Sequence, residues 1–512
     1  MCQVEVIIRL KESDGQMVSE TTLATHTFNL LDVEDIPRSE RVDRMEEVTL
    51  QEGWEIMRQL FLKQWEVIEQ RELQRRLNNA TADSIQLDGK DSLKVVSRLG
   101  ILELPRQVCV DPVSGTHSIP LNDLLPEHEG PLTTRGLQEW ACLLPQELPF
   151  RTAQRLLGWM THDPEVISFN QVRHWVQVHG EVIRQAEAAD VKALLAQSDL
   201  TKFPPNLVPA ERPRRRPDWP EELCAAVEKI LSSSQSTPPE GISPPDWERV
   251  LTYQRETAAE LGDPDADLAC LGPEVRPQQV VAVTDGIVVR RQERRRWLEI
   301  RTARVTTAQG YRYLSGLGDN FLNQLMLLLL LCQSSGLTWL TLLGDGARWI
   351  RVLFQSLTGW AHQELILDWY HLKHKCYELV SLICRGRKAK AELLGPLLLD
   401  LWTGQLDAAL TRLCEYRPQT KNEAKLDELI GYLEKNRTAI PNYQKRRAHS
   451  LFIGSGQAEK ANDLLVARRQ KHQGMHWEDK TSDALCALKT LLLNQEWDTY
   501  WQERSVPSLT AA

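Results

Sequence analysis

The stretch QQVVAVTDGIVVRR, residues 278–291, decides how the second half of this chain folds. Its apolar run predicts a buried strand that ends at Asp285, and the run WLEIRTARV after it predicts the second strand of a hairpin. Further along, LTWLTLLGDGA (337–347) repeats the pattern of a buried strand that ends in a carboxylate, here Asp345. A helix expected from about Asp319 to Gln333 separates the two, which predicts an α/β domain with helices packed on a sheet.

Both aspartates precede a glycine and follow a buried run, so their carboxylates are expected at strand ends, where open α/β sheets bind ligands. Hard divalent cations prefer oxygen ligands, and two Mg²⁺ ions about 4 Å apart can organise phosphoryl transfer. A third carboxylate, Glu459, lies one turn into a helix expected after the flexible GSG, and its distance of four positions from Ser455 excludes a capping box. The alternative is that Asp-Gly marks an ordinary turn. Together, Asp285, Asp345 and Glu459 favour a catalytic metal site.

The segment LDWYHLKHK adds Asp368 and His371 near the end of a further strand expected in residues 362–371. His371 is a candidate to position a phosphate or to support the metal site. The alternative is a solvated histidine in a loop.

Two basic strips flank the proposed site. Residues 290–304 carry seven Arg against two Glu, and residues 445–471 carry seven Lys or Arg against Glu459 and Asp463. Because the planar guanidinium binds phosphate in a bidentate way, the strips predict contacts to a DNA backbone; a solvated charged face is the alternative. The candidate DNA-binding residues are Arg290, Arg291, Arg294, Arg295, Arg296, Lys460, Arg468, Arg469 and Lys471.

The first half of the chain predicts a mixed α+β region. Residues 1 to about 50 alternate like strands, and residues 50 to 80 follow a helical pattern. Helices around 151–160 and 168–186, joined by THDPEV with Ser168 as the cap, give a helix-turn-helix outline that could bind DNA, although packed helix pairs are common.

The pattern divides the chain into six segments. They are a mixed module (1–95), a small β region with the helix pair (96–200), Pro- and Ser-rich linkers with connecting helices (201–274), the first part of the α/β core (275–371), a helical insertion (372–450), and the last part of the core with C-terminal helices (451–512).

Composition sets outer limits. With 512 residues, 42% hydrophobic and 26% charged, the chain is typical of a multidomain globular protein. A net charge of -9 argues against a protein that coats nucleic acid over its whole surface. Ten cysteines without a CxxC pair, and no secretory signal or membrane-length apolar run, favour the cytoplasm and no membrane partner.

The motifs TDG (284–286), LLGDGARWI (342–350), DWYHL (368–372) and IGSGQAEK with ARRQKHQGMHW (within 453–477) together resemble the ISKra-type bacterial insertion-sequence transposases, relatives of the Mutator-like group. The resemblance covers about 275–500. It implies an RNase H-like core interrupted by a helical insertion between the second Asp and the Glu, with a mixed sheet flanked by helices.

By this resemblance, Asp285, Asp345 and Glu459 form the catalytic, metal-binding triad, and Asp368 and His371 match a supporting D-x-x-H element. The implied enzyme is a bacterial, nucleoid-associated DDE transposase that cuts double-stranded DNA at terminal inverted repeats and joins the 3′ ends to target DNA. The implied cofactor is two Mg²⁺ ions, for which Mn²⁺ can substitute. Synapsis of two ends implies a homo-oligomer on DNA. Relatives carry a CxxC zinc pair where only Cys109 stands here, so no zinc is expected.

Three alternatives remain open from the residues. A nuclease with the same core would need the same carboxylates without strand transfer. A non-catalytic DNA-binding descendant would have lost at least one carboxylate, whereas all three are present. A helical scaffold with incidental Asp-Gly turns would leave the three residues far apart.

Overall fold

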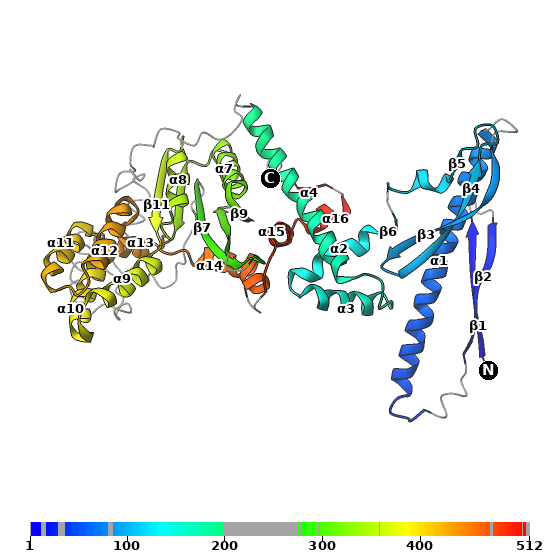
Figure 1. The fold of residues 1–512 in the computed structure, drawn as a ribbon, viewed down its shortest axis with the longest axis horizontal. Helices are drawn as coiled ribbons and strands as arrows, with labels where there is room; N and C mark the ends of the chain where they lie inside the picture. The colour runs from blue at the N-terminus through cyan, green and yellow to red at the C-terminus, as the bar shows by residue number, and fades with distance from the viewer. Residues whose placement is uncertain are drawn as a thin grey trace. The chain divides into compact units, whose positions relative to one another are not determined.

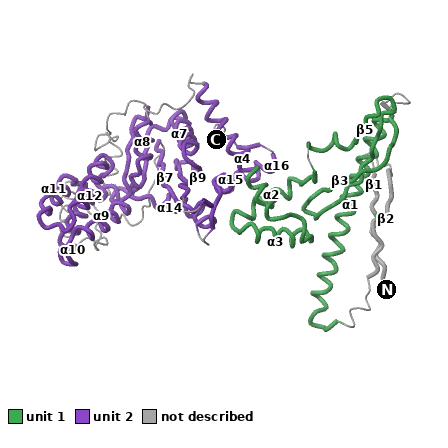
Figure 2. Tube along the Cα trace, viewed as in Figure 1, with its two compact units in different colours: residues 1–178 green, residues 179–512 purple. Residues whose placement is uncertain are grey.

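A computed structural model describes residues 2–11, 17–28, 36–79, 85–127, 130–197, 275, 278–293, 297–357, 359–471, 475–503 and 505–507. The chain divides into two compact units, Met1–Val178 and His179–Ala512, which are described separately (Figure 2). Within these residues, no helix is long and apolar enough to cross a membrane. The predicted linkers between residues 203 and 247, with their Pro-Arg run, lie outside the described ranges.

The first unit opens with an antiparallel hairpin and a long helix. Strands β1 (Cys2–Lys11) and β2 (Met17–Phe28) pair along their length, and α1 spans Arg41–Asn79. The helix begins earlier than the predicted start near residue 50. The reason is that Val42, Met45 and Val48 are three residues apart among charged residues that favour helices. This spacing fits a helix and not the alternation of a strand.

A four-stranded mixed sheet and short helices complete this unit. Strand order is β5-β4-β3-β6, with β3 antiparallel to β4 and parallel to β6. The predicted boundary between residues 95 and 96 falls inside the β3–β4 hairpin. The elements are β3 (Gln86–Ser97), β4 (Gly100–Val110), β5 (His117–Ser118), a 3-10 turn (Pro120–Leu124), β6 (Leu132–Thr133), α2 (Arg135–Leu143), a 3-10 turn (Leu144–Gln146), α3 (Phe150–Met160) and the start of α4 (Phe169–Gln197).

The second unit is built on a five-stranded mixed sheet of order β11-β10-β7-β8-β9 (Figure 1). The predicted hairpin is confirmed, since β7 and β8 pair antiparallel, and β9 extends it. After it, β10 and β11 add in parallel on the other side of β7, each reached through a helix. The strands are β7 (Gln279–Arg290), β8 (Trp297–Thr307), β9 (Gly310–Gly316), β10 (Trp339–Gly344) and β11 (His362–Leu367).

Helices pack on this sheet, which confirms the predicted α/β arrangement with a mixed sheet flanked by helices. The apolar run Leu325–Cys332 lies in α7 (Gly318–Ser334), whose Phe321, Leu325 and Leu329 are fully buried against the strands. Helix α8 (Arg348–Ser356) connects β10 to β11. Near the chain's end come α14 (Gly456–Asn462), a π-helix (Asp463–Lys471), α15 (Asp479–Leu493) and α16 (Trp497–Gln502).

Between β11 and α14 the elements are all helical, as the pattern in 372–450 predicted. Their buried residues, among them Leu397, Leu413 and Tyr443, belong to the same hydrophobic cluster as the sheet, so this segment shares one core with the strands. The helices are α9 (Trp369–Ile383), α10 (Gly386–Trp402), α11 (Leu406–Tyr416), α12 (Glu423–Lys435) and α13 (Tyr443–Ala448), with 3-10 turns at Arg417–Gln419 and Arg437–Ala439.

Candidate functional site

Three aspartates stand level with one another at one edge of the sheet. The last pair of the β10–β11 ladder is Gly344 with Leu367, so the next residues are Asp345 and Asp368. The ladder between β10 and β7 ends at Leu343 with Val283, and two more steps set Asp345 opposite Asp285. Because the three strands are parallel, this is their common C-terminal edge, where α/β sheets bind ligands.

Asp285 differs from its predicted place at a strand end. Strand β7 continues through Ile287 and Val289 to Arg290. Both β-branched side chains are buried, and both residues pair with β8 beyond the point where β10 stops. Asp285 is therefore at the end of the parallel part of β7 and in the middle of its antiparallel part.

The turn explanation fits only one of the two Asp-Gly pairs. The Asp345 carboxylate accepts a hydrogen bond from the Ala347 N–H at 2.8 Å, and Gly346 has φ +84°, as a turn requires. Gly286 instead pairs with Arg301 inside the β7–β8 ladder. A turn thus accounts for Gly346 and leaves the carboxylate of Asp285 without that explanation.

Glu459 reaches the same neighbourhood from the far end of the chain. Helix α14 packs on β7 and β8, and Figure 1 shows it, in orange, beside β7 in green. Its residue Asn462 donates from Nδ2 to Asp285 Oδ2 at 2.8 Å and accepts at Oδ1 from the Thr302 hydroxyl at 2.6 Å. Glu459 lies one turn before the buried Asn462 on this helix and is exposed, and its charge acts on Asp285. Sequence reasoning missed Asn462, whose only signal is its spacing from Glu459.

The charges of these residues act on one another. Burial, followed by the negative charges of Asp345 and Glu459, raises the pKa of Asp285 to about 6, against the opposing Gly286 N–H and the positive charge of His371. The effects of Asp345 and Glu459 on Asp285 show that the three carboxylates lie in one neighbourhood. The scaffold alternative, in which the three residues lie far apart, disagrees with this arrangement.

Asp368 is a buried structural carboxylate. It is 0% exposed, caps α9 by accepting from the His371 N–H at 2.7 Å, and accepts at Oδ2 from the Ser455 N–H and, at 2.6 Å, from the Ser455 hydroxyl. Burial alone would raise its pKa, but the hydrogen bonds from His371 and Ser455 outweigh it and hold the pKa below the ordinary value. Asp368 thus joins the start of α9 to the loop that begins α14.

His371 lies beside this carboxylate, with Nδ1 at 3.3 Å from Asp368 Oδ1. The hydrogen bond with Asp368, together with the charges of Asp368, Asp285 and Asp345, raises the pKa of His371 to about 9 against the effect of burial. A protonated imidazolium therefore faces the acidic residues at neutral pH, where it offsets part of their charge.

The loop before α14 is packed tightly. A Cβ at Gly454 would lie 2.8 Å from the Tyr370 ring and 3.3 Å from Asp368 Oδ2, so only glycine fits. Ser455 is the N-cap of α14 but spends its hydroxyl on Asp368 rather than on the helix. Helix capping therefore does not occupy Glu459, as its spacing from Ser455 indicated.

The donor chemistry of this edge fits a hard divalent cation, since Asp285, Asp345 and Glu459 supply carboxylate oxygens. In the side-chain positions of this structure, no group of three His, Cys, Asp or Glu among the described residues converges on a single metal position. Asp285 and Asp345 each turn an oxygen toward a backbone N–H, of Gly286 and Ala347 respectively. Glu459 is exposed.

The first basic strip is only partly described, because Arg294, Arg295 and Arg296 lie outside the described residues. Arg290 is exposed at the end of β7 with its guanidinium over the Trp297 ring at 5.7 Å. Arg291 is half-buried and binds Asp479 at 2.8 Å.

The second strip lies on α14 and the π-helix, and its members differ. Lys460 and Lys471 are exposed, and Arg468 is exposed but pairs with Asp463 at 2.8 Å. Arg469 is only 5% exposed and stacks over Trp477 at 4.9 Å. Its guanidinium packs the interior, which leaves little surface for a phosphate.

The two strips meet in space. The Trp477 N–H donates to the Arg290 carbonyl at 2.8 Å, and the Gln292 N–H donates to the Trp477 carbonyl at 2.8 Å. Arg469 contacts the same tryptophan. The end of β7 and the π-helix therefore form one surface near the acidic edge.

In the first unit, the helix pair predicted as a helix-turn-helix outline is present as α3 and α4. Ser168 caps α4 as predicted: its hydroxyl accepts from the Gln171 N–H at 3.2 Å, and Gln171 Oε1 accepts from the Ser168 N–H at 2.9 Å, which completes a capping box. Helix α4 runs to Gln197, farther than the predicted end near residue 186.

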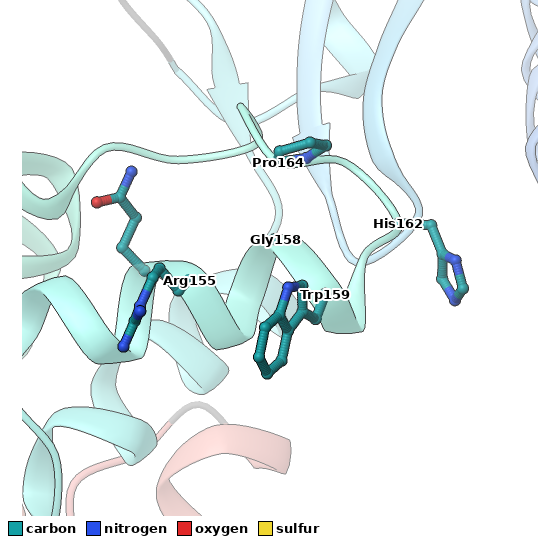
Figure 3. A pocket seen from close by; sticks show the side chains of 6 residues that line it. Arg155, Gly158, Trp159, His162 and Pro164 are labelled. Carbon is teal, nitrogen blue, oxygen red and sulfur yellow. The ribbon is translucent and has the colours of Figure 1, made fainter.

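A shallow pocket lies beside the turn between these helices (Figure 3). Arg155 and Trp159 project from the same side of α3, and His162 and Pro164 follow on the turn. Trp159 is 74% exposed, which is unusual for so large an apolar ring.

Comparison of the chain with protein-family models and with curated proteins finds no match. The resemblance to the transposase family therefore rests on the quoted motifs alone.

Proposed function

We propose that this chain is a DDE-type transposase of the ISKra type, with Asp285, Asp345 and Glu459 as its catalytic carboxylates. The observation that carries the proposal is that Asp345, after β10, and Glu459, in α14, lie close enough to Asp285 in β7 to act on its charge. Incidental turn residues have no reason to gather there, and acidic clusters that raise a pKa mark functional sites.

The fold supports the RNase H-like part of the proposal. The mixed sheet is flanked by helices, and the helices from Trp369 to Ala448 intervene in sequence between Asp345 and Glu459. This is the interruption that the resemblance implies. Asp368 and His371 correspond to the supporting D-x-x-H element, with Asp368 fixing the loop before α14.

Chemically, the three carboxylates would hold two Mg²⁺ ions, which when bound lower the pKa of water and organise in-line displacement at phosphorus. The chain's own residues prepare that site. Asp285 and Asp345 are held by backbone N–H groups, and His371 supplies positive charge beside them. His371 is also suited to contact a phosphate oxygen of the bound strand.

For DNA, the exposed cations of the two basic strips, among the described residues and apart from the ion-paired Arg468, include Arg290, Lys460 and Lys471. We assign these to backbone contacts, together with Arg294, Arg295 and Arg296, whose placement is not described. Arg468 and Arg291 can join by exchanging their Asp partners for phosphate. Arg469 is better suited to packing Trp477.

The α3–α4 pair is proposed to read the DNA ends. The exposed start of α4 carries Asn170, Arg173 and His174, spaced three and four apart on one face. Asn and Arg are the side chains that bind adenine and guanine edges in a bidentate way. The exposed Trp159 on α3 adds an apolar contact beside this face.

The test is cleavage and joining of labelled duplexes that tile the DNA flanking the gene, with Mg²⁺ or Mn²⁺. Wild type should cut and join, whereas Asp285→Ala, Asp345→Ala and Glu459→Ala should lose activity by roughly 10³-fold or more, since each removes a ligand. Asp498→Ala, an exposed carboxylate on α16, is the matched control and should keep activity.

Other outcomes decide between the alternatives. Cutting without joining would favour a nuclease. Binding without cutting by every protein, wild type included, would favour a non-catalytic DNA-binding protein. Triad variants as active as wild type would refute the site.

End recognition has its own test by fluorescence anisotropy with the same duplexes. Arg173→Ala should cost about 1–3 kcal/mol of binding and relax sequence preference, as expected for a base contact. Lys388→Ala, an exposed lysine of α10, should leave both unchanged. Equal losses in the two variants would argue against base reading by α4.

A further inference from the structure

We propose that Asn462 is a positioning residue that sets the orientation of Asp285 and the distance between Asp285 and Glu459. The inference rests on the proposed function, because it concerns how the same carboxylates are held for a divalent cation. It is carried by the contacts of one buried amide, which is 7% exposed.

The amide of Asn462 joins two residues that face each other across the β7–β8 ladder. Asp285 pairs with Thr302 in that ladder, and Asn462 donates to the first while accepting from the second. The chemistry fixes this direction. If the amide were turned over, its carbonyl oxygen would face the Asp285 carboxylate, and two acceptors would meet.

This contact completes a matched pair of donors on Asp285. The Gly286 N–H binds Oδ1 at 2.7 Å, and Asn462 binds Oδ2 at 2.8 Å. Each oxygen keeps further lone-pair capacity, since an ionised carboxylate has about four acceptor sites. The carboxylate is therefore held in one orientation while it can still bind a cation.

The same contact fixes the helix that carries Glu459. Asn462 is the last residue of α14, one turn after Glu459, at the point where the α-helix changes to the π-helix Asp463–Lys471. Helix α14 packs on β7 and β8 through Ala458 and Ala461, and the amide adds hydrogen bonds that fix its end to both strands. Moving Asn462 would move Glu459 relative to Asp285.

A second asparagine provides a matched control elsewhere in the unit. Asn494, after α15, accepts from the Tyr313 N–H at 2.8 Å and donates to the Tyr313 carbonyl at 3.1 Å. It also joins a helix end to a strand through both amide atoms, but it contacts no carboxylate of the proposed site. Removing it should affect stability alone.

The experiment measures Mn²⁺ affinity of the full chain by calorimetry without DNA, with thermal unfolding in parallel. Residues that hydrogen-bond to metal ligands change metal affinity by about 10- to 100-fold, so Asn462→Ala should weaken Mn²⁺ binding by about tenfold or more. Asn494→Ala should not change the affinity. Thr302→Val should weaken binding less than Asn462→Ala, and Thr302→Ser, which keeps the hydroxyl, should restore it.

The outcomes separate the two proposals. If wild type binds Mn²⁺, Asp285→Asn abolishes binding, and Asn462→Ala binds as tightly as wild type, the inference fails and the proposed function stands. If wild type does not bind, or Asp285→Asn binds equally, the metal site fails and the inference fails with it. Should Asn462→Ala not fold, the Thr302→Val and Thr302→Ser pair decides: equal affinity in both overturns the inference.

Discussion

Two places in the larger unit bring acidic side chains together, and they differ in how the negative charge is offset. On α4, the buried Arg184 binds both Glu187 at 2.8 Å and Asp483 at 2.9 Å, so two partly buried carboxylates share one guanidinium. At the sheet edge, Asp285 is surrounded by further carboxylates, with His371 as a partial offset. The first arrangement ties α4 to α15 through two hydrogen bonds from Arg184 to Asp483. The second raises the pKa of Asp285, a property that is frequent among residues of functional sites.

The largest expected effect comes from removing Arg184, which binds Glu187 and Asp483. Arg184→Met leaves Glu187 and Asp483 without their cation and should lower the free energy of unfolding by about 3–5 kcal/mol, measured in urea. Arg417→Met removes an exposed ion pair with Asp427 and should cost about 0–1 kcal/mol. Equal losses would mean that burial does not distinguish the two.

The carboxylates around Asp285 should instead make the stability of the protein depend on added divalent cation. At about 100 times its dissociation constant, Mn²⁺ should raise the free energy of unfolding of wild type by about 2.7 kcal/mol. Asp285→Asn and Asp345→Asn remove ligands and should show little of this gain in thermal unfolding. A gain of the same size in both variants would place the cation elsewhere.

Without metal, neutralising Asp285 should stabilise the fold. The pKa of Asp285 is raised from 3.8 to about 6, so the folded state holds this proton more tightly than the unfolded state. Wild-type stability should therefore fall as pH rises from about 4 through 6, and Asp285→Asn should be more stable by about 1–3 kcal/mol at about pH 7.5. Chemical denaturation across this range checks the sign. A less stable variant at every pH would contradict it.

The smallest effect is expected at His371, whose positive charge offsets part of the negative charge around Asp285. Because the pKa of His371 is raised from 6.5 to about 9, its charge stabilises the fold fully below 6.5 and ceases to do so as pH rises through 9. The side chain is 39% exposed, so solvent screening limits the effect of His371→Gln to about 1 kcal/mol. Unfolding at several pH values should show the difference shrinking; a constant difference would point to packing alone.

Much of the fold could be predicted because its signals are local. The β7–β8 hairpin, the buried run in α7 and the capping of α4 by Ser168 each depend on neighbours in sequence, and all three are confirmed. The predicted start of α1 near residue 50 was wrong, since the helix begins at Arg41. Helix boundaries are harder to predict than the existence of a helix.

The candidate carboxylates could be recognised in the sequence, whereas the residues that hold them in position could not. Carboxylates after buried strands are visible in sequence, but Asp285 proved to be mid-strand, since the length of a partner strand decides where a ladder ends. Asn462 was missed, and Arg469 was predicted to bind DNA although it is buried against Trp477. Both depend on contacts with residues outside their own helical turn, which the local sequence does not show.

The π-helix Asp463–Lys471 has a consequence for how such a protein can change by insertion and deletion. Each residue added to or removed from a helix rotates all that follows by about 100°, and π segments are sites where a helix has absorbed an extra residue. Here the π-helix begins after Glu459 and Asn462 and contains Arg468 and Lys471. Under the proposed function, a single-residue deletion at Leu464 should therefore keep Mn²⁺ affinity while altering DNA affinity, which would let the DNA-contacting surface change without the acidic residues.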